Sequence, residues 1–599
     1  MIYVTINMKN IVFACLLALL PTVVSAQIET IVKGDCTPIS MDDDVSGARG
    51  GQHQRRLPSV RTNWDPSRVY RQAVILVSFS DTDFSINNPN AFYNSLFNEK
   101  GFNQRQGPGC VADYLRDQSG GLFNVQFDIF GPIKVNKMAQ PYANPDSNTR
   151  NFGRDVFIEA TQKVIDSLQV DFTPYDWGND GWVDQVVYVY AGLTGNQSTE
   201  KCYGHIWPNT SSFSTITTNS VRISNYTCSA EQWSNGSSCG IGTILHEYTH
   251  SLGLPDIYPT SSGAGYSTMD EWDIMDGGNF TNYGWCPPNY TALEKILLGW
   301  LTPVELTQPQ TITSMKPVAD GGEVYRIKHT ENEWLLLENR EQEGWDIGLP
   351  GKGLLIYHVD YNKSSWSGNV VNNDKNKRRC ELVHADNMDY DKWYNYLMSW
   401  QKPKQYANSD HMNSYILSTS SYPWVTDSTL FVNDLLTDRS VPSAKMNNLN
   451  SRGSTMLSKS ITNIVKSGED GSISFDFMAD APKCAAPTIS YENGRIHFES
   501  ETEGAKFVSK VTSSNNMENE SDEVSLVTQY VITVYAVADG YINSDTVTAT
   551  LKWNNGKMTG ENIDIQDSEY KNGDVNKDGT VDVADISAVI TIMATGDVE

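Results

Sequence analysis

Two histidines and a glutamate in this chain have the spacing of a catalytic metal site. His246, Glu247 and His250 form the pattern HExxH, in which side chains four residues apart on an α-helix project from one face. Both imidazoles can therefore bind the same ion. Gly253 is expected to end the helix and turn the chain back, which brings Asp256 within reach as a third ligand. Three protein ligands leave one position for water, as a catalytic zinc site requires.

Apolar residues around this motif predict a helix that is buried along one side and holds the two imidazoles rigidly. They recur at helical spacing, at Ile241, Ile244, Leu245, Tyr248 and Leu252. The alternative is a helix that carries two histidines by chance. With 9 histidines in 599 residues such a match is rare, and the continuation through Gly253 and Asp256 makes it rarer. We therefore interpret the motif as a catalytic metal site.

The composition of the chain predicts a multidomain globular protein. A chain of 599 residues exceeds the size at which one hydrophobic core stops growing, and 39% of its residues are hydrophobic. The formal net charge is −27 at pH 7, and the acidic residues are spread along the chain. This balance argues against nucleic acid or an anionic membrane as a partner, and it suits calcium ligation and solubility outside the cell.

The N-terminus has the three-part layout of a secretory signal peptide. Lys9 precedes an apolar run that ends in small residues up to Ala26. Residues 1–26 are therefore expected to be removed, and the mature protein to be secreted, extracellular or associated with the cell surface. No later segment has the roughly 18 uninterrupted apolar residues of a membrane span. Residues 27–68 are polar and irregular, and we interpret them as a linker or as a pro-segment that is cleaved.

The cysteine count permits disulfide bonds. Of the 9 cysteines, Cys15 lies in the signal peptide, and its removal leaves an even number in an exported protein. Cys202, Cys228 and Cys239 all precede the HExxH helix. A bridge between two of them would brace the metal site, although their spacing does not indicate which pair would form it.

Strands and helices alternate in the segment before the motif. Residues 73–79 and 185–192 are continuous apolar runs of the kind that form strands in a sheet covered on both faces. Residues 155–168 between them have helical apolar spacing. Together with the metal helix, these elements predict an α/β sandwich that extends to about residue 300.

A loop before the second of these strands has part of a calcium-binding spacing. Asp176, Asp180 and Asp184 occupy positions one, five and nine of such a loop, and a glycine occupies the turn position. Gly178 and Val187 stand where two further ligands are expected. The loop is therefore interpreted either as a structural calcium site or as an Asp- and Gly-rich turn that leads into the strand.

The chain beyond the motif is expected to be rich in β-structure. Met275 falls in a tight turn after the helix, where a methionine can form a soft apolar base beneath a zinc site. Short alternating strands predict a β-rich domain over residues 304–482 that is associated with the preceding segment. Residues 483–553 predict a small Ig-like β-sandwich, and residues 554–572 are expected to be a linker.

The C-terminus carries a complete calcium-loop pattern. The ligands expected at positions 1, 3, 5, 7, 9 and 12 are Asp574, Asn576, Asp578, the Thr580 carbonyl, Asp582 and Asp585. A glycine occupies the turn position, and a helical apolar pattern follows the loop. Residues 573–599 are therefore expected to bind calcium.

Several segments together resemble the immune inhibitor A-like secreted zinc peptidases, a metzincin-like family. They include AVILVSFSD, WGNDGWVDQVVYVYAG, HEYTHSLGLPDIY, WDIMDGG and GLPGKGLLIYHVD, and they span roughly residues 70–480. The implied fold class is multidomain. It has an α/β metzincin-like zinc peptidase domain at residues 69–303, followed by β-rich domains and a short calcium loop-helix tail.

The resemblance also implies roles for the residues of the motif. His246, His250 and Asp256 would hold zinc, Glu247 would be the general base, and Met275 would lie in the Met-turn. The C-terminal tail is similar to a single dockerin repeat, which implies a cohesin-type or cell-surface partner.

The motif and the resemblance together predict a secreted zinc-dependent endopeptidase. It would hydrolyse peptide bonds of extracellular proteins through a zinc-activated water, with Glu247 as the general base. Its partner in that reaction is a protein or peptide substrate. The alternative is a secreted binding or adhesion protein in which the peptidase site is vestigial and the C-terminal modules carry the function.

Overall fold

The computed structural model describes most of the chain between residues 61 and 566. The described residues are 61–146, 150–197, 199–218, 220–261, 266–399, 412, 414–426, 432–492, 494–520, 522–554, 557–566, 583, 585 and 586. The predicted signal peptide and most of segment 27–68 lie outside the described residues. Of the six ligands predicted for the C-terminal calcium loop, the structure describes Asp585, whose side chain is buried, and the other five also lie outside.

The first sheet has five strands in the order β2-β1-β3-β5-β4. These strands are β1 (Val69–Ser78), β2 (Asn124–Lys134), β3 (Val186–Leu193), β4 (Asn209–Thr218) and β5 (Val221–Gln232). The strands β2, β1, β3 and β5 run parallel, and the edge strand β4 is antiparallel to β5. Strands β1 and β3 lie in the two apolar runs, so the prediction of two buried strands is confirmed.

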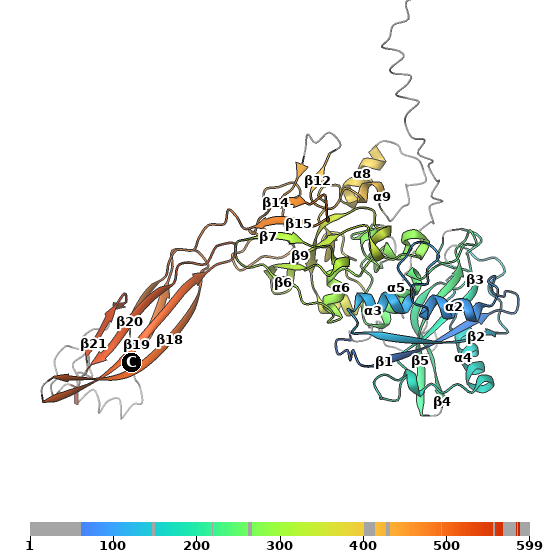
Figure 1. The fold of residues 1–599 in the computed structure, drawn as a ribbon, viewed down its shortest axis with the longest axis horizontal. Helices are drawn as coiled ribbons and strands as arrows, with labels where there is room; N and C mark the ends of the chain where they lie inside the picture. Colours follow the sequence, from blue (N-terminus) through green and yellow to red (C-terminus); the bar gives the residue numbers. More distant parts are fainter. Residues whose placement is uncertain are drawn as a thin grey trace, which may run out of the picture.

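Helices cover both faces of this sheet (Figure 1). They are α2 (Pro89–Asn98), α3 (Val111–Gln118), α4 (Arg154–Leu168) and α5 (Gly242–Ser251). Helices α2, α3 and α5 share a hydrophobic core with Val74 and Leu76 of β1. Helix α4 packs on the opposite face, with Ala73 and Ile75. Burial on both faces explains why β1 is apolar at consecutive positions.

The second and third sheets follow the first in the chain. The second has the order β11-β10-β9-β8-β6 and consists of β6 (Val304–Glu305), β8 (Tyr325–Thr330), β9 (Glu333–Arg340), β10 (Gly353–Asp360) and β11 (Cys380–Leu382). The third has the order β14-β15-β7 and consists of β7 (Gln310–Met315), β14 (Ile461–Lys466) and β15 (Ile473–Phe477). Their strands confirm the prediction that this part of the chain is rich in β-structure.

The second sheet lies between two hydrophobic cores. Leu336 of β9 and Leu355 of β10 belong to the core that contains helix α5. Leu335 and Leu354, which point to the other face of the same strands, belong to a separate core shared with the third sheet. The boundary predicted at residue 303 therefore does not separate two cores, because the second sheet completes the first.

Short elements connect the sheets. The α-helices among them are α6 (Ala292–Leu297), α7 (Lys363–Ser367), α8 (Tyr390–Ser399) and α9 (Ser414–Leu417). The 3-10 helices are η2 (Thr173–Tyr175), η3 (Asp270–Trp272), η4 (Gly278–Gly284), η5 (Val318–Asp320) and η6 (Gly344–Gly348). Strands β12 (Trp424–Val425) and β13 (Val432–Asn433) form a two-stranded sheet.

Two further small sheets form an extension that projects from the rest of the molecule (Figure 1). One contains β16 (Thr488–Glu492), β17 (Arg495–Glu499) and β22 (Asp564–Ile565), and the other contains β18 (Lys506–Glu520), β19 (Glu523–Val537), β20 (Val547–Asn554) and β21 (Lys557–Glu561). Ile489, Ile532 and Leu551 join both sheets in one core. The linker predicted at residues 554–572 needs correction, because β21 and β22 lie within it and pair with β20 and β16. Strand β21 is a largely exposed edge strand, and its polar sequence resembles that of a linker.

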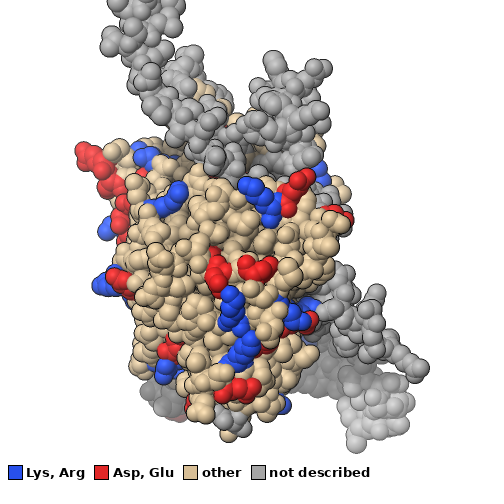
Figure 2. Space-filling view, turned by 90° about the vertical axis from the view of Figure 1, so that its right-hand side faces the viewer, with Lys and Arg blue, Asp and Glu red and all other residues tan. Residues whose placement is uncertain are grey.

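The surface at the end of the molecule with the first sheet carries both signs of charge in small neighbouring groups (Figure 2). Wide areas of uncharged residues separate these groups. This face therefore has no extended basic surface of the kind that binds nucleic acid among its described residues. Within the same described part of the chain, no helix combines the length and the hydropathy needed to cross a bilayer.

The three cysteines before the metal helix do not form the expected bridge. No disulfide joins Cys202, Cys228 or Cys239 to one another or to another described cysteine. All three side chains are buried. The Cys228 Sγ on β5 instead contacts Asn209 Nδ2 on the neighbouring strand, at 3.2 Å. Packing in the core, rather than a covalent bridge, therefore holds the segments that precede the helix.

Candidate metal centre

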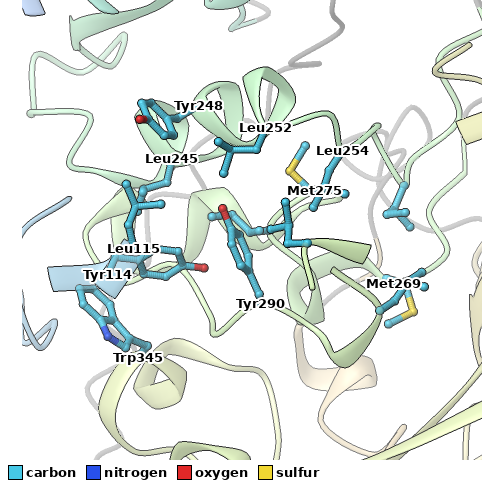
Figure 3. Close-up of a cluster of buried hydrophobic side chains, with 14 of the residues drawn as sticks. Tyr114, Leu115, Leu245, Tyr248, Leu252, Leu254, Met269, Met275, Tyr290 and Trp345 are labelled. Atoms are coloured by element: carbon cyan, nitrogen blue, oxygen red, sulfur yellow. The ribbon is translucent and has the colours of Figure 1, made fainter. Parts of the chain in front are cut away.

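Helix α5 carries the HExxH motif through the middle of the first core. Figure 3 places Leu245 and Tyr248 of this helix in one cluster with Leu252 and Met275. The predicted apolar side of the helix is confirmed, because all five of its residues are buried. Gly253 follows with φ of 101°, in a backbone region that favours glycine. The chain turns there, as the sequence predicts, and the helix is held rigidly on its apolar side.

This turn brings His246, His250 and Asp256 together. The Nε2 atom of each imidazole lies 3.2 Å from Asp256 Oδ1, and all three side chains are completely buried. Among the described residues, no other group of three or more His, Cys, Asp or Glu side chains has its ligand atoms gathered at one point. The three residues that the sequence suggests as metal ligands are therefore neighbours in the structure.

Hydrogen bonds on the far side of each imidazole show which nitrogen faces the ligand cluster as an acceptor. His246 Nδ1 lies 2.7 Å from Ile274 O, and His250 Nδ1 lies 2.8 Å from Leu254 O. Since a carbonyl oxygen only accepts, Nδ1 carries the hydrogen of the neutral ring. Both Nε2 lone pairs then face a carboxylate oxygen without a hydrogen bond. A cation between these acceptors removes their repulsion, and this ligand set fits zinc.

The carboxyl group of Asp256 responds to positive charge at the same point. Burial raises its pKa, but the imidazoles of His250 and His246 that face it outweigh burial and lower the pKa to about 2. A metal cation bound by the two imidazoles would favour the ionised carboxylate in the same way. The site is therefore suited to hold a positive charge that the neutral rings do not themselves supply.

Glu247 lies next to the ligands and is held by the edge strand β4. The Oγ1 atom of Thr210 on this strand lies 2.5 Å from Glu247 O and 3.1 Å from Glu247 Oε2. Both side chains are buried. Thr210 therefore helps to orient the carboxylate next to the metal ligands. Sequence patterns do not indicate this role of Thr210, because threonines are frequent in strands and its contact with Glu247 spans 37 residues.

Met275 lies in a turn that contacts the ligands through its backbone. The Asp273 carboxylate accepts a hydrogen bond from Met275 N at 2.6 Å. Burial of this carboxyl group raises the pKa of Asp273 to about 7. Met275 O accepts from Ile257 N at 2.8 Å, and the preceding Ile274 O binds His246. The turn thereby fixes both the ring of His246 and the segment of the third ligand.

The loop with Asp176, Asp180 and Asp184 uses its carboxylates within the protein. Asp176 accepts hydrogen bonds from Asp180 N at 3.1 Å and from Gly181 N at 2.8 Å. Asp184 accepts from the backbone of the same loop and forms an ion pair with Arg61. Nor do the three carboxylates form a ligand group in the described part of the chain. These hydrogen bonds are those of an Asp- and Gly-rich turn, and the calcium site stays a prediction.

A protein-family model matches the part of the chain that contains the three candidate metal ligands. Residues 80–295 match the family model described as immune inhibitor A peptidase M6, catalytic domain. This range contains all of the residues that surround the metal centre on α5 and in the two turns after it. The match covers a minority of the chain, so it describes this region rather than the whole protein.

Two relatives are similar to part of this chain. Immune inhibitor A of Bacillus thuringiensis subsp. alesti is 25% identical over 294 residues, which are 40% of this chain and 42% of the relative. The pre-pro-metalloprotease PrtV of Vibrio cholerae serotype O1 is 22% identical over 243 residues, which are 36% of this chain and 26% of the relative. The chain thus spans less than half the length of either relative. Together with the family match over residues 80–295, these relatives support a peptidase of the immune inhibitor A M6 family.

Proposed function

We propose that the chain is a secreted zinc-dependent endopeptidase with a metzincin-like active site, which hydrolyses peptide bonds in extracellular proteins. The observation that carries the proposal is the group of three buried acceptor atoms from His246, His250 and Asp256. Glu247 follows His246 on the same helix. The metallopeptidase family match supports a metal at this point. Secretion is proposed from the signal-like sequence of residues 1–26.

Glu247 is the residue proposed to move the proton in this reaction. Bound zinc would supply Lewis-acid polarisation of the scissile carbonyl and would make a water molecule more acidic. Glu247 would take the proton of that water and pass it to the leaving amine. The hydrogen bond from Thr210 to Oε2 restrains the carboxylate, so that its orientation is set before substrate binds.

The test of this function is proteolysis by the purified full chain. We expect internal peptide bonds of unfolded protein substrates to be cleaved, with the products identified by mass spectrometry. A chelator should abolish cleavage, and added zinc should restore it. A chain that binds zinc yet cleaves no protein in a broad panel, even after removal of residues 27–60, would favour the alternative of a binding or adhesion protein with a vestigial site.

Replacing the third ligand should remove the metal. In Asp256→Ala, we expect zinc content after dialysis to fall far below the single ion per chain of a site with three protein ligands. Asp360→Ala is the matched control, because Asp360 is also buried but pairs with Arg379. It should retain wild-type zinc content. Elemental analysis of both variants measures the difference, and full zinc content in Asp256→Ala would show that another group is the third ligand.

The C-terminal tail is proposed to bind calcium and to attach the protein to a cohesin-type or cell-surface partner. The support is the spacing of oxygen ligands in residues 574–585, which matches a calcium loop at every ligand position. Calorimetric titration of the full chain with calcium should therefore release or absorb heat that is lost in Asp574→Ala. Identical titrations for the two chains would exclude this loop as the calcium site.

A further inference from the structure

Three asparagines from the β-rich region lie along the segment that carries the third metal ligand. Asn372 Nδ2 donates to Ile257 O at 2.7 Å. Asn373 Oδ1 accepts from Thr260 N, also at 2.7 Å. These contacts join residues 369–373, which follow helix α7, to the turn that follows helix α5. The metal centre is therefore covered on this side by a part of the chain far from it in sequence.

Asn369, the first of these asparagines, makes a two-point contact with Asp256. Asp256 N donates to Asn369 Oδ1 at 2.7 Å, and Asn369 Nδ2 donates to Asp256 Oδ2 at 2.8 Å. The partners determine the orientation of the amide, because the reverse orientation would set donor against donor and acceptor against acceptor. The contact occupies Oδ2 and leaves Oδ1, which lies 3.2 Å from both imidazole nitrogens, as the atom that faces the metal.

We propose that Asn369 is a positioning residue that orients Asp256 as the third ligand, which makes residues 369–373 part of the metal centre. An isolated carboxylate rotates broadly about its Cβ–Cγ bond and can present either oxygen. Asn369 Nδ2 holds one carboxylate oxygen of Asp256, and Asn369 Oδ1 holds the backbone N–H of Asp256. One orientation is therefore selected before a metal binds, as outer-shell partners of metal ligands do elsewhere. This inference rests on the proposed zinc-dependent function.

Asn369 belongs to the β-rich region of the chain. It lies outside residues 80–295, the region that matches the peptidase family. Its backbone has φ of 53°, a left-handed conformation that asparagine adopts more readily than most residues other than glycine. Both the conformation and the side-chain chemistry of this position therefore suit asparagine. It follows that the peptidase region depends on the β-rich region to bind its metal tightly.

The test is the zinc affinity of the purified full chain and of its Asn369→Gly variant. Glycine adopts the left-handed backbone without strain, so the variant removes the amide and little else. We expect zinc affinity to weaken about 10–100-fold, as for the loss of other outer-shell partners. Competition with a chelating zinc indicator measures it without reference to activity. Asn369→Ala removes the same contacts at a strained backbone, and is the second variant, with at least the same loss expected.

Two controls separate this role from general effects on folding. Asn387→Gly is the same substitution at another left-handed position, with φ of 58°, where the side chain contacts Lys392. It should bind zinc as the wild type does. Asn373→Ala loses the bonds to Thr260 and its neighbour but none to Asp256, and should have a smaller effect than Asn369→Gly. Circular dichroism of the metal-free chains confirms that the variants are folded.

The outcomes distinguish the inference from the proposed function. Wild-type zinc affinity in folded Asn369→Gly would overturn the role of Asn369 and leave the function standing. Equal losses in Asn369→Gly and Asn373→Ala would also overturn it, because docking of the segment would then explain both. A wild-type chain that binds no zinc at all would refute the proposed metal centre, and the inference with it.

Discussion

Replacing Glu247 with glutamine should lower kcat/KM for peptide hydrolysis by about 10²–10⁴-fold, the usual contribution of general acid–base catalysis. Glutamine has nearly the size of glutamate, and its amide oxygen can still accept the hydrogen bond from Thr210. It cannot take a proton from water. Glu247 is not among the three acceptors that face the metal, so zinc content should stay unchanged. The expected signature is loss of turnover in a chain that keeps its metal.

The matched control for this variant is Glu294→Gln. Glu294 is also a buried glutamate, and burial together with the Asp273 charge raises its pKa well above the usual value. Glutamine has nearly the size of this side chain and can still accept hydrogen bonds. The kcat/KM of Glu294→Gln should remain near that of the wild type. Steady-state kinetics and elemental analysis on both variants decide the matter, because full activity in Glu247→Gln would exclude Glu247 as the base.

The parts of the metal centre that depend on local sequence could be predicted. The apolar residues of helix α5 recur at helical spacing because one side of the helix is buried, and the same pattern sets His246 and His250 on one face. The turn after the helix follows from a single glycine with φ of 101°. Strand β1 could also be predicted, because burial on both faces makes its sequence continuously apolar.

The contacts that orient these residues could not be predicted from the same patterns. Thr210 reaches Glu247 from an edge strand, and Asn369 reaches Asp256 across 113 residues of sequence. Neither position has a local pattern that distinguishes it from an ordinary strand or turn residue. Their roles come from the packing of distant elements, which a motif does not encode.

The predicted calcium loop near strand β3 shows a different limit of sequence patterns. Aspartates in Gly-rich turns can bind a cation, but they can equally accept hydrogen bonds from backbone N–H groups of their own loop. Asp176 does the second, with Asp180 N and Gly181 N as donors. The spacing alone is compatible with both arrangements. An arginine from outside the loop, Arg61, pairs with Asp184 and could not be anticipated from the loop sequence.

The β-rich region is joined to the peptidase region by a fully buried arginine. Arg340 on β9 donates to Asp346 through Nε at 2.7 Å and to Glu338 through Nη1 at 2.9 Å. It also donates to Asn289 O, which precedes helix α6 in the other region. Burial opposes the charge of Arg340, but Asp346 and Glu338 outweigh burial and raise its pKa above the usual value. These groups form a buried ionic network, and removal of any one charge leaves an uncompensated charge in the core.

Replacing Arg340 with methionine should lower the free energy of unfolding by about 3–5 kcal/mol, as when one partner of a buried ion pair is removed. Methionine fills much of the same volume, but it leaves Asp346 and Glu338 buried without their cation. Urea unfolding followed by tryptophan fluorescence measures the change, because several tryptophans lie in the shared first core, including Trp272 and Trp345.

Arg326→Met provides the control for this prediction. Arg326 lies on the neighbouring strand β8 and pairs with Glu305, but this pair is partly exposed to solvent. Its loss should change stability by about 0–1 kcal/mol, the range of surface ion pairs. Arg340→Met should also make residues 80–295 and 304–482 lose structure together, since one core spans them. An unfolding curve in which the β-rich region melts separately, with the peptidase region intact, would contradict the view that both regions build one metal-binding unit.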